Sequence, residues 1–302
     1  MRYAIDAWDP NYGAAVAPVL DQSTAPRDLD VERPERDWAP IAAGTTPAHD
    51  VLFVDGVRRI DARVWAVGDT HTAPALAVSV AAGAVRCNAT ARVVDTRVAR
   101  FLVGRAGLAP ITGSGLAWTP LAAADDDEAT LVQAVQSEMG RLEALVAGDV
   151  PDADLVVLDG PLSGRTHLDD AVGYVKSHRM SYLPASVEGV VRRLGPGERT
   201  PVFLLQANWP RFSWYLRLPG GTGHPWAGVV RIEAPANVTE VGAAVALADV
   251  VGATLPRFAS PAHRDARAPV NLLPIAGLED TLHHLLGDRD LLTRRLRLAV
   301  AS

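Results

Sequence analysis

The chain has 302 residues, 48% of them hydrophobic, and a net charge of −6. This length allows one large domain or two ordinary ones around a buried core. The acidic balance argues against a broad basic face that coats nucleic acid, although it allows a narrow basic channel. The single cysteine, Cys87, excludes an internal disulfide and a zinc site built of several thiolates.

The first 50 residues are rich in Pro, Asp and Trp and show weak periodicity. We predict an extended N-terminal arm over residues 1–50, followed by one domain over residues 51–302. The N-terminus lacks an apolar signal core, and no run of 18 apolar residues follows. We therefore expect a cytoplasmic protein.

The pattern sharpens from residue 51 onward. Residues 51–57 and 58–67 are predicted to form two adjacent antiparallel strands, and two further segments extend the same sheet. The segment 125–148 is the best helix, because it begins with acids and its apolar residues recur every three or four positions. The two further strand segments are residues 75–85 and 91–103.

Strands and helices then alternate to the end of the chain. Residues 153–160 are apolar on both faces, which is typical of a buried parallel strand. This order predicts an α/β fold, with a ribonuclease-H-like core and a mixed sheet flanked by helices. The remaining predicted strands are 200–207, 213–218 and 227–234, and the remaining helical segments are 185–195, 239–253 and 278–300.

Two of these predicted strands carry an aspartate followed by glycine, Asp55 and Asp159. Burying an aspartate costs free energy of folding unless a positively charged group pairs with it. Carboxylates on adjacent strands can share one cation, since neighbouring strands lie about 4.8 Å apart. The alternative interpretation is that each Asp-Gly pair only marks a turn.

Further ligands are expected from two other segments. The helix over 125–148 offers Glu143 or Glu138, of which Glu143 is favoured because it borders the apolar stripe. A late segment offers His263 or Asp265. Several carboxylates with at most one histidine suit Mn²⁺ or Mg²⁺, and two such ions can support phosphodiester hydrolysis.

Lys176 is the only lysine beside 28 arginines. Its place shortly after the strand that ends at Asp159 predicts a compact cation that contacts a substrate phosphate or orients water. The sequence HRDARAPVN (263–271) looks like a kinase catalytic loop, but Asn271 follows Asp265 by six residues instead of five. No Gly-rich phosphate loop accompanies it.

The order of VLFVDGVRRI, MGRLEAL, LVVLDGPL, GYVKSHRMSYLP and AHRDARAPVNLLP resembles the NurA nuclease family over about residues 50–290. The resemblance implies a DNA nuclease that requires Mn²⁺ or Mg²⁺, with 5′→3′ exonuclease and single-strand endonuclease activity in end resection and double-strand break repair. It also implies a homodimer docked on a hexameric HerA-type DNA-translocating ATPase.

The resemblance carries particular roles over to this chain. It implies that Asp55, Glu143 and Asp159 are catalytic metal ligands, with Glu138 as a competitor of Glu143. The late site residue falls on His263, with Asp265 as its competitor, and the site lysine falls on Lys176. The competing interpretations are a catalytically inactive, nuclease-like adaptor subunit of a DNA-translocating ATPase and an actin-like kinase.

Overall fold

The computed structural model describes residues 16–42, 44–68, 72–113, 115–150, 152–163, 168, 171–207, 209–236 and 239–301. The first fifteen residues of the predicted arm therefore lie outside the described residues. By its internal contacts the chain divides into two compact units. The first unit comprises Met1–Phe53, Arg86–Arg92 and Asp152–Ala276, and the second comprises Val54–Val85, Val93–Pro151 and Gly277–Ser302.

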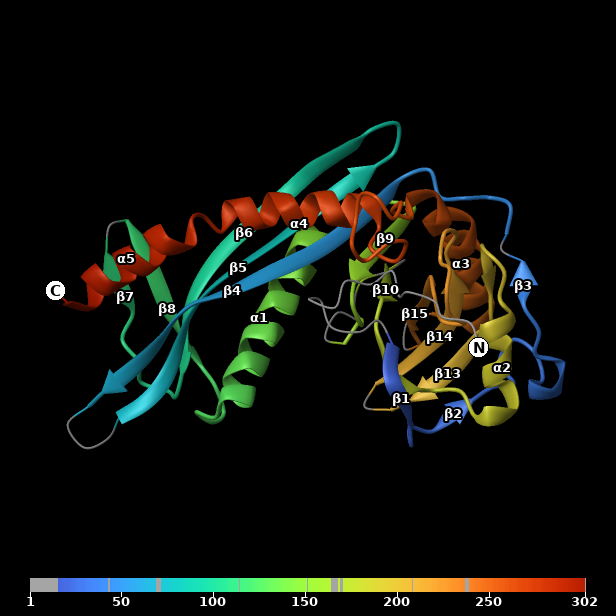
Figure 1. Ribbon diagram of the computed structural model, residues 1–302, viewed down its shortest axis with the longest axis horizontal. Helices are drawn as coiled ribbons and strands as arrows, with labels where there is room; N and C mark the ends of the chain where they lie inside the picture. The colour runs from blue at the N-terminus through green and yellow to red at the C-terminus, as the bar shows by residue number, and fades with distance from the viewer. Residues whose placement is uncertain are drawn as a thin grey trace. The chain divides into compact units, whose positions relative to one another are not determined.

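The fold is α/β, with a large mixed sheet flanked by helices, as the sequence predicts for a ribonuclease-H-like core. Figure 1 shows the elements along the chain. In the described residues the helices are α1 (Glu128–Asp149), α2 (Ala185–Arg193), α3 (Val241–Thr254), α4 (Leu273–Leu285) and α5 (Arg289–Ala301), with 3-10 turns at Glu35–Asp37 and Leu255–Phe258.

Thirteen described strands belong to this sheet, and two more form a small separate one. The strands are β1 (Val16–Gln22), β2 (Arg27–Asp28), β3 (Ile41–Ala42), β4 (Val51–Val67), β5 (Thr72–Cys87), β6 (Ala91–Gly104), β7 (Ile111–Gly113), β8 (Leu116–Ala122), β9 (Leu155–Asp159), β10 (Ala171–Val175), β11 (His178–Ser181), β12 (Glu198–Arg199), β13 (Phe203–Gln206), β14 (Pro210–Arg217) and β15 (Val229–Pro235).

The main path of the large sheet runs β2-β13-β14-β15-β10-β9-β4-β5-β6-β8-β7. β9 and β10 are parallel, with Asp159 opposite Tyr174, whereas β10 and β15 are antiparallel. The meander β4-β5-β6, the helix α1 and the strand β9 follow one another in the order that the sequence predicts. β9 therefore takes an interior place in the sheet, as its apolar character requires.

The described part of the arm is built from short paired segments. β1 pairs with β11, β2 with β13, and β3 with β12. Trp38 and Leu29 lie in the core cluster of the first unit, which also includes the buried face of α2. The division into an arm of residues 1–50 and a domain of residues 51–302 stays a prediction.

Two predictions of element boundaries are wrong. Residues 51–57 and 58–67 form the single 17-residue strand β4, because nothing at their junction turns the chain and Gly56 continues it in extended conformation. The segment 278–300 is broken into α4 and α5 at Gly287, whose φ of 82° lies in the left-handed region that favours glycine.

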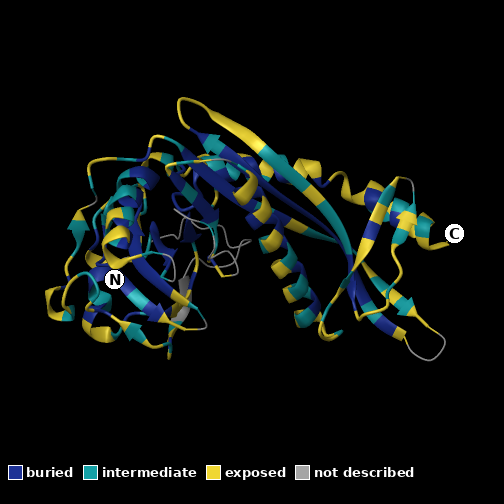
Figure 2. Ribbon diagram, turned by 180° about the vertical axis from the view of Figure 1, so that it is seen from behind, coloured by how far each residue is buried: buried dark blue, intermediate teal, exposed yellow. Residues whose placement is uncertain are grey.

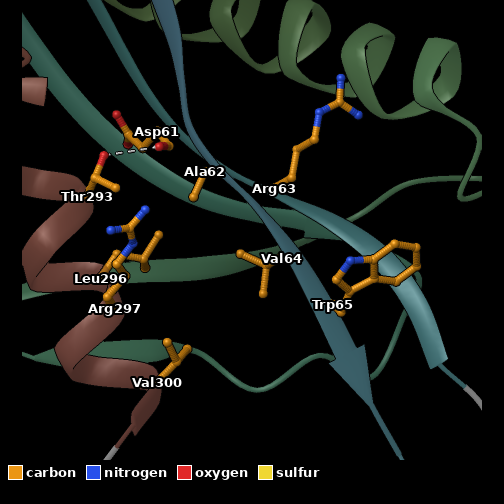
Figure 3. Close-up of a pocket in the computed structure, with 9 residues that line it drawn as sticks. All are labelled: Asp61, Ala62, Arg63, Val64, Trp65, Thr293, Leu296, Arg297 and Val300. Carbon is orange, nitrogen blue, oxygen red and sulfur yellow. Dashed lines mark hydrogen bonds between the residues drawn. The ribbon is translucent and has the colours of Figure 1, made fainter. Parts of the chain in front are cut away.

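The second unit contains the long strands β4, β5 and β6 together with α1. Figure 2 shows buried positions along β5 and an exposed start of β6. α5 packs on this unit through Leu292 and Leu296, which join the cluster around Trp118. The Thr293 hydroxyl donates to the main-chain carbonyl of Asp61 at 3.3 Å, as Figure 3 shows.

α3 and the 3-10 turn after it are, among the described residues, the one helical stretch apolar and long enough to cross a membrane. Its side chains Ala244, Ala248 and Val251 are fully buried within the protein. The Thr254 hydroxyl accepts a hydrogen bond from the main chain of Ala48 at 2.9 Å. These contacts bury one face of α3 against the rest of the protein.

Candidate metal centre

Asp55 lies inside a strand, not at a turn. It is 5% exposed and follows the fully buried Phe53 and Val54 on β4. One of its carboxylate oxygens, Oδ1, accepts a hydrogen bond from the N–H of Gly56 at 2.7 Å. The turn interpretation of this Asp-Gly pair is therefore wrong, and the strand holds a carboxylate where burial is expensive.

Glu143 lies against the backbone next to Asp55. α1 begins at the cap Asp127, and Glu143 lies on its buried face with 3% exposure. A Cβ atom built on Gly56 would lie only 2.5 Å from Oε1 of Glu143 and 2.9 Å from Cγ of Met139. A side chain at position 56 would therefore force Glu143 and Met139 to move, because the side chains of α1 lie directly against the backbone of β4.

Glu138, the competitor of Glu143, has a different environment. Its Oε1 accepts a hydrogen bond at 2.9 Å from Nε of Arg141, on the next turn of the same helix. The structure therefore places Glu143, and not Glu138, beside the strand of Asp55.

Hydrogen bonds connect the two segments that precede the neighbouring strands β4 and β9. The carboxylate of Asp154 accepts hydrogen bonds from the N–H groups of His49 (3.0 Å) and Asp50 (2.9 Å), and its own N–H donates to the Asp50 carbonyl. Asp55 and Asp159 lie five residues beyond Asp50 and Asp154, respectively.

Asp159 ends β9 and pairs with Lys176, which follows β10. The Lys176 ammonium lies 2.6 Å from Oδ2 of Asp159, and both side chains are largely buried. Gly160 then adopts φ of 88° and donates to the Tyr174 carbonyl, so the chain turns back over β10. Burial raises the pKa of Tyr174 well above 10, and the charge of Asp159 adds to the effect.

The structure adds an acid that sequence reasoning missed. Asp55, Asp159 and Glu279 of α4 each offer a carboxylate oxygen, and these oxygens lie within 4.8 Å of one another. One local signal points to Glu279, since it follows Leu278 on the buried stripe of a helix. That signal is no stronger than the one for many helix glutamates.

The two late residues that the sequence offers as ligands have other surroundings. His263 is exposed in the turn segment before α4. Asp265 accepts hydrogen bonds from the N–H of Arg267 (2.6 Å) and from Nδ2 of Asn271 (2.7 Å). Oδ1 of Asn271 in turn accepts from the Lys176 ammonium at 2.8 Å. Asp265 is thus connected to Asp159 through Asn271 and Lys176.

The residues present fit a hard divalent cation. The donor set is entirely carboxylate oxygen, the kind that Mg²⁺ and Mn²⁺ prefer. Oδ1 of Asp159 is buried and, among the residues that the structure describes, has no hydrogen-bond partner. A buried carboxylate oxygen facing other acids is costly unless a cation lies between them.

An α/β protein with a ribonuclease-H-like core and a buried acidic cluster has the architecture of a metal-dependent hydrolase of nucleic acids. The chain matches the NurA domain over residues 49–276, which is well over half of its length. It belongs to the NurA family, a family of nucleases linked to DNA repair. No curated protein was found to match the chain.

Proposed function

We propose that this protein is a DNA nuclease that hydrolyses phosphodiester bonds with divalent metal ions, in the two-metal manner. The observation that carries the proposal is the approach of the oxygens of Asp55, Asp159 and Glu279 to within 4.8 Å of one another. Glu143, whose Oε1 lies against Gly56, is proposed as a fourth ligand. These four acids would hold Mn²⁺ or Mg²⁺.

A bound divalent ion supplies Lewis acidity toward the phosphate and lowers the pKa of a coordinated water. Charge neutralisation and substrate positioning come from the chain's own residues. Lys176 neutralises part of the acidic cluster through Asp159 and presents a compact positive charge to a phosphate. The acids, fixed on strands and helices, hold their geometry before substrate arrives, which is what preorganised catalysis requires.

The proposal extends to substrate and partners. We expect 5′→3′ exonuclease and single-strand endonuclease activity in DNA end resection and double-strand break repair, by a cytoplasmic homodimer docked on a hexameric HerA-type ATPase. Membership of the NurA family supports this extension. The net charge of −6 is compatible with it, because a motor that feeds the strand makes a broadly basic exterior unnecessary.

The decisive experiment measures cleavage of end-labelled single-stranded DNA with Mn²⁺, with Mg²⁺ and with EDTA. Asp55→Asn and Asp159→Asn should each lower the single-turnover rate about a thousandfold, since losing a ligand removes several kcal/mol of transition-state stabilisation. Phosphorothioate blocks at either end test polarity, and a circular substrate tests endonuclease activity.

A matched pair on α1 tests the choice of helix ligand. Glu143→Gln should abolish cleavage, whereas Glu138→Gln, five residues away on the same helix, should leave it near the wild-type rate. Equal losses in both variants would contradict the assignment of Glu143. A wild-type protein that binds a HerA-type ATPase but never cuts DNA would instead be a nuclease-like adaptor.

A further inference from the structure

Asn271 lies between two charged side chains. It is fully buried in the segment that precedes α4. Its Oδ1 accepts a hydrogen bond from Nζ of Lys176 at 2.8 Å, and its Nδ2 donates to Oδ2 of Asp265 at 2.7 Å. The carboxylate of Asp265 is itself held by the N–H of Arg267 at 2.6 Å.

The chemistry of the two neighbours fixes how this amide must lie. An ammonium group only donates hydrogen bonds, and an ionised carboxylate only accepts them. The carbonyl end of Asn271 must therefore face Lys176, and its amino end must face Asp265. An aspartate at position 271 would set two carboxylates against each other, and a leucine would leave both neighbours without this partner.

The lysine that Asn271 contacts is the one beside the acidic cluster. Lys176 Nζ lies 2.6 Å from Oδ2 of Asp159 and 2.8 Å from Oδ1 of Asn271. An ammonium has three donors, so two of them are directed by these oxygens and the third direction is set as a consequence. The loop that carries Asn271 is also anchored, since the Tyr174 hydroxyl donates to the Val270 carbonyl at 2.7 Å.

We infer that Asn271, oriented by Asp265, is a positioning residue that holds the Lys176 ammonium beside Asp159 and directs it toward a substrate phosphate. This inference rests on the proposed nuclease function. It gives a role to the HRDARAPVN segment: Asp265 and Asn271 form a hydrogen-bonded pair that supports a lysine and do not themselves bind the ion.

The first test observes Lys176 directly and needs no activity. Because the chain contains one lysine, protein labelled with [ε-¹³C]lysine gives a single ε-methylene signal. In the wild-type protein we expect its two protons to be inequivalent, as in an immobilised side chain. In Asn271→Leu the signal should move to the averaged position of a mobile lysine.

Tyr174→Phe is the control for general loosening. It removes a hydrogen bond to the same loop, at Val270, without touching the Lys176 contact. Its lysine signal should stay at the wild-type position. An unchanged lysine signal in Asn271→Leu, or an equal change in both variants, would overturn the inference.

The second test exchanges the two residues. Asp265→Asn alone places the amide N–H₂ of the new asparagine against a hydrogen-bond donor, and Asn271→Asp alone places two carboxylates against each other. Each single variant should therefore lower the single-turnover rate 10- to 100-fold, as is typical when the support of a metal-site residue is lost. The double variant Asp265→Asn/Asn271→Asp restores complementary pairs and should recover most of the rate. Failure of the double variant to recover while it stays folded would count against the inference.

The third test asks whether Asn271 acts through the lysine. Asn271→Leu should slow cleavage 10- to 100-fold in the wild-type background and not at all in a Lys176→Met background. A similar further loss in the Lys176→Met background would overturn the inference. If the wild-type protein cuts no DNA, the proposed nuclease function fails, and the lysine signal still decides whether Asn271 positions Lys176.

Discussion

Two buried aspartates lie six residues apart on β4, and the groups around them differ in kind. Asp61 accepts hydrogen bonds from Ser79 Oγ (2.6 Å), Arg59 Nε (3.0 Å) and Trp118 Nε1 (3.3 Å). Asp55 accepts a hydrogen bond from the N–H of Gly56 at 2.7 Å and in addition lies near acids, with oxygens of Asp159 and Glu279 within 4.8 Å. Figure 3 shows the surroundings of Asp61 next to α5.

The buried Glu233 of β15 resembles Asp61 in this respect. Its Oε1 accepts hydrogen bonds from Arg211 Nε at 2.9 Å and from Arg231 Nη1 at 2.5 Å. Acids that are surrounded by donors stabilise a fold without further help. Acids that are gathered with other acids need a cation, so the kind of neighbour separates structural carboxylates from functional ones.

The largest expected effect comes from substituting the two β4 aspartates in the absence of metal. Asp61→Asn should lower the free energy of unfolding by about 3–5 kcal/mol, because it leaves Arg59 and Trp118 facing an amide. Asp55→Asn should leave it unchanged or raise it, because the substitution removes repulsion between carboxylates. Urea denaturation in EDTA measures both. A loss in Asp55→Asn as large as that in Asp61→Asn would break the comparison.

His178 extends the comparison to a buried, titratable group. Its Nε2 lies 2.9 Å from the Val229 carbonyl, its ring packs on Trp226, and burial lowers its pKa to about 4. The unfolded chain takes up a proton near pH 6.5, where the folded protein does not. The stabilisation is therefore complete above pH 6.5 and is lost as pH falls toward 4, by on the order of 3 kcal/mol.

The measurement is the free energy of unfolding between pH 7 and 4. His178→Gln should flatten that part of the curve, because glutamine does not titrate. His263→Gln, which changes an exposed side chain, should keep the wild-type curve. Identical slopes in wild type and His178→Gln would show that this histidine does not set the acid sensitivity.

Binding of the cation should reverse the effect of the acidic cluster, so that the cluster increases the free energy of unfolding. A ligand that binds only the folded protein stabilises it by about 2.7 kcal/mol at a hundred times its Kd. Mn²⁺ should therefore raise the melting temperature of the wild-type protein and of Asp61→Asn, and should not raise that of Asp55→Asn. Calorimetric scans with Mn²⁺ and with EDTA check this. Equal shifts in all three proteins would place the ion elsewhere.

Local signals in the sequence single out Asp55 and Asp159, whose oxygens lie within 4.8 Å of each other, because each follows an apolar run where a carboxylate is unexpected. They were not enough for Glu279, which reaches the cluster only through the path of α4. Asn271 has no local signal either, since its neighbours Lys176 and Asp265 are separated from it by 95 and six residues. Hydrogen bonds formed over such sequence distances depend on the folded topology.

The same limit explains the errors in the elements. The Asp-Gly turn signal places Gly56 near the end of a predicted strand. In the structure its missing side chain makes room for Glu143 from a helix that begins more than 70 residues later. The apolar run over residues 51–57 and the alternation over residues 58–67 predict strand correctly. They cannot tell one long strand from two, since that depends on what packs against the junction.

The smallest effect, and the most specific, comes from adding one methyl group at Gly56. Gly56→Ala places a Cβ 2.5 Å from Oε1 of Glu143 and 2.9 Å from Cγ of Met139, so these two side chains must move. We expect a loss of about 2 kcal/mol in the free energy of unfolding and slower cleavage, because Glu143 moves relative to Asp55.

Gly140→Ala is the control. Gly140 lies on α1, the helix of Glu143, and a Cβ built on it would have nothing within 4 Å. The substitution should stabilise the protein by about 1 kcal/mol without changing cleavage. Wild-type cleavage by Gly56→Ala would show that the close approach of Glu143 to β4 is not needed by the metal centre.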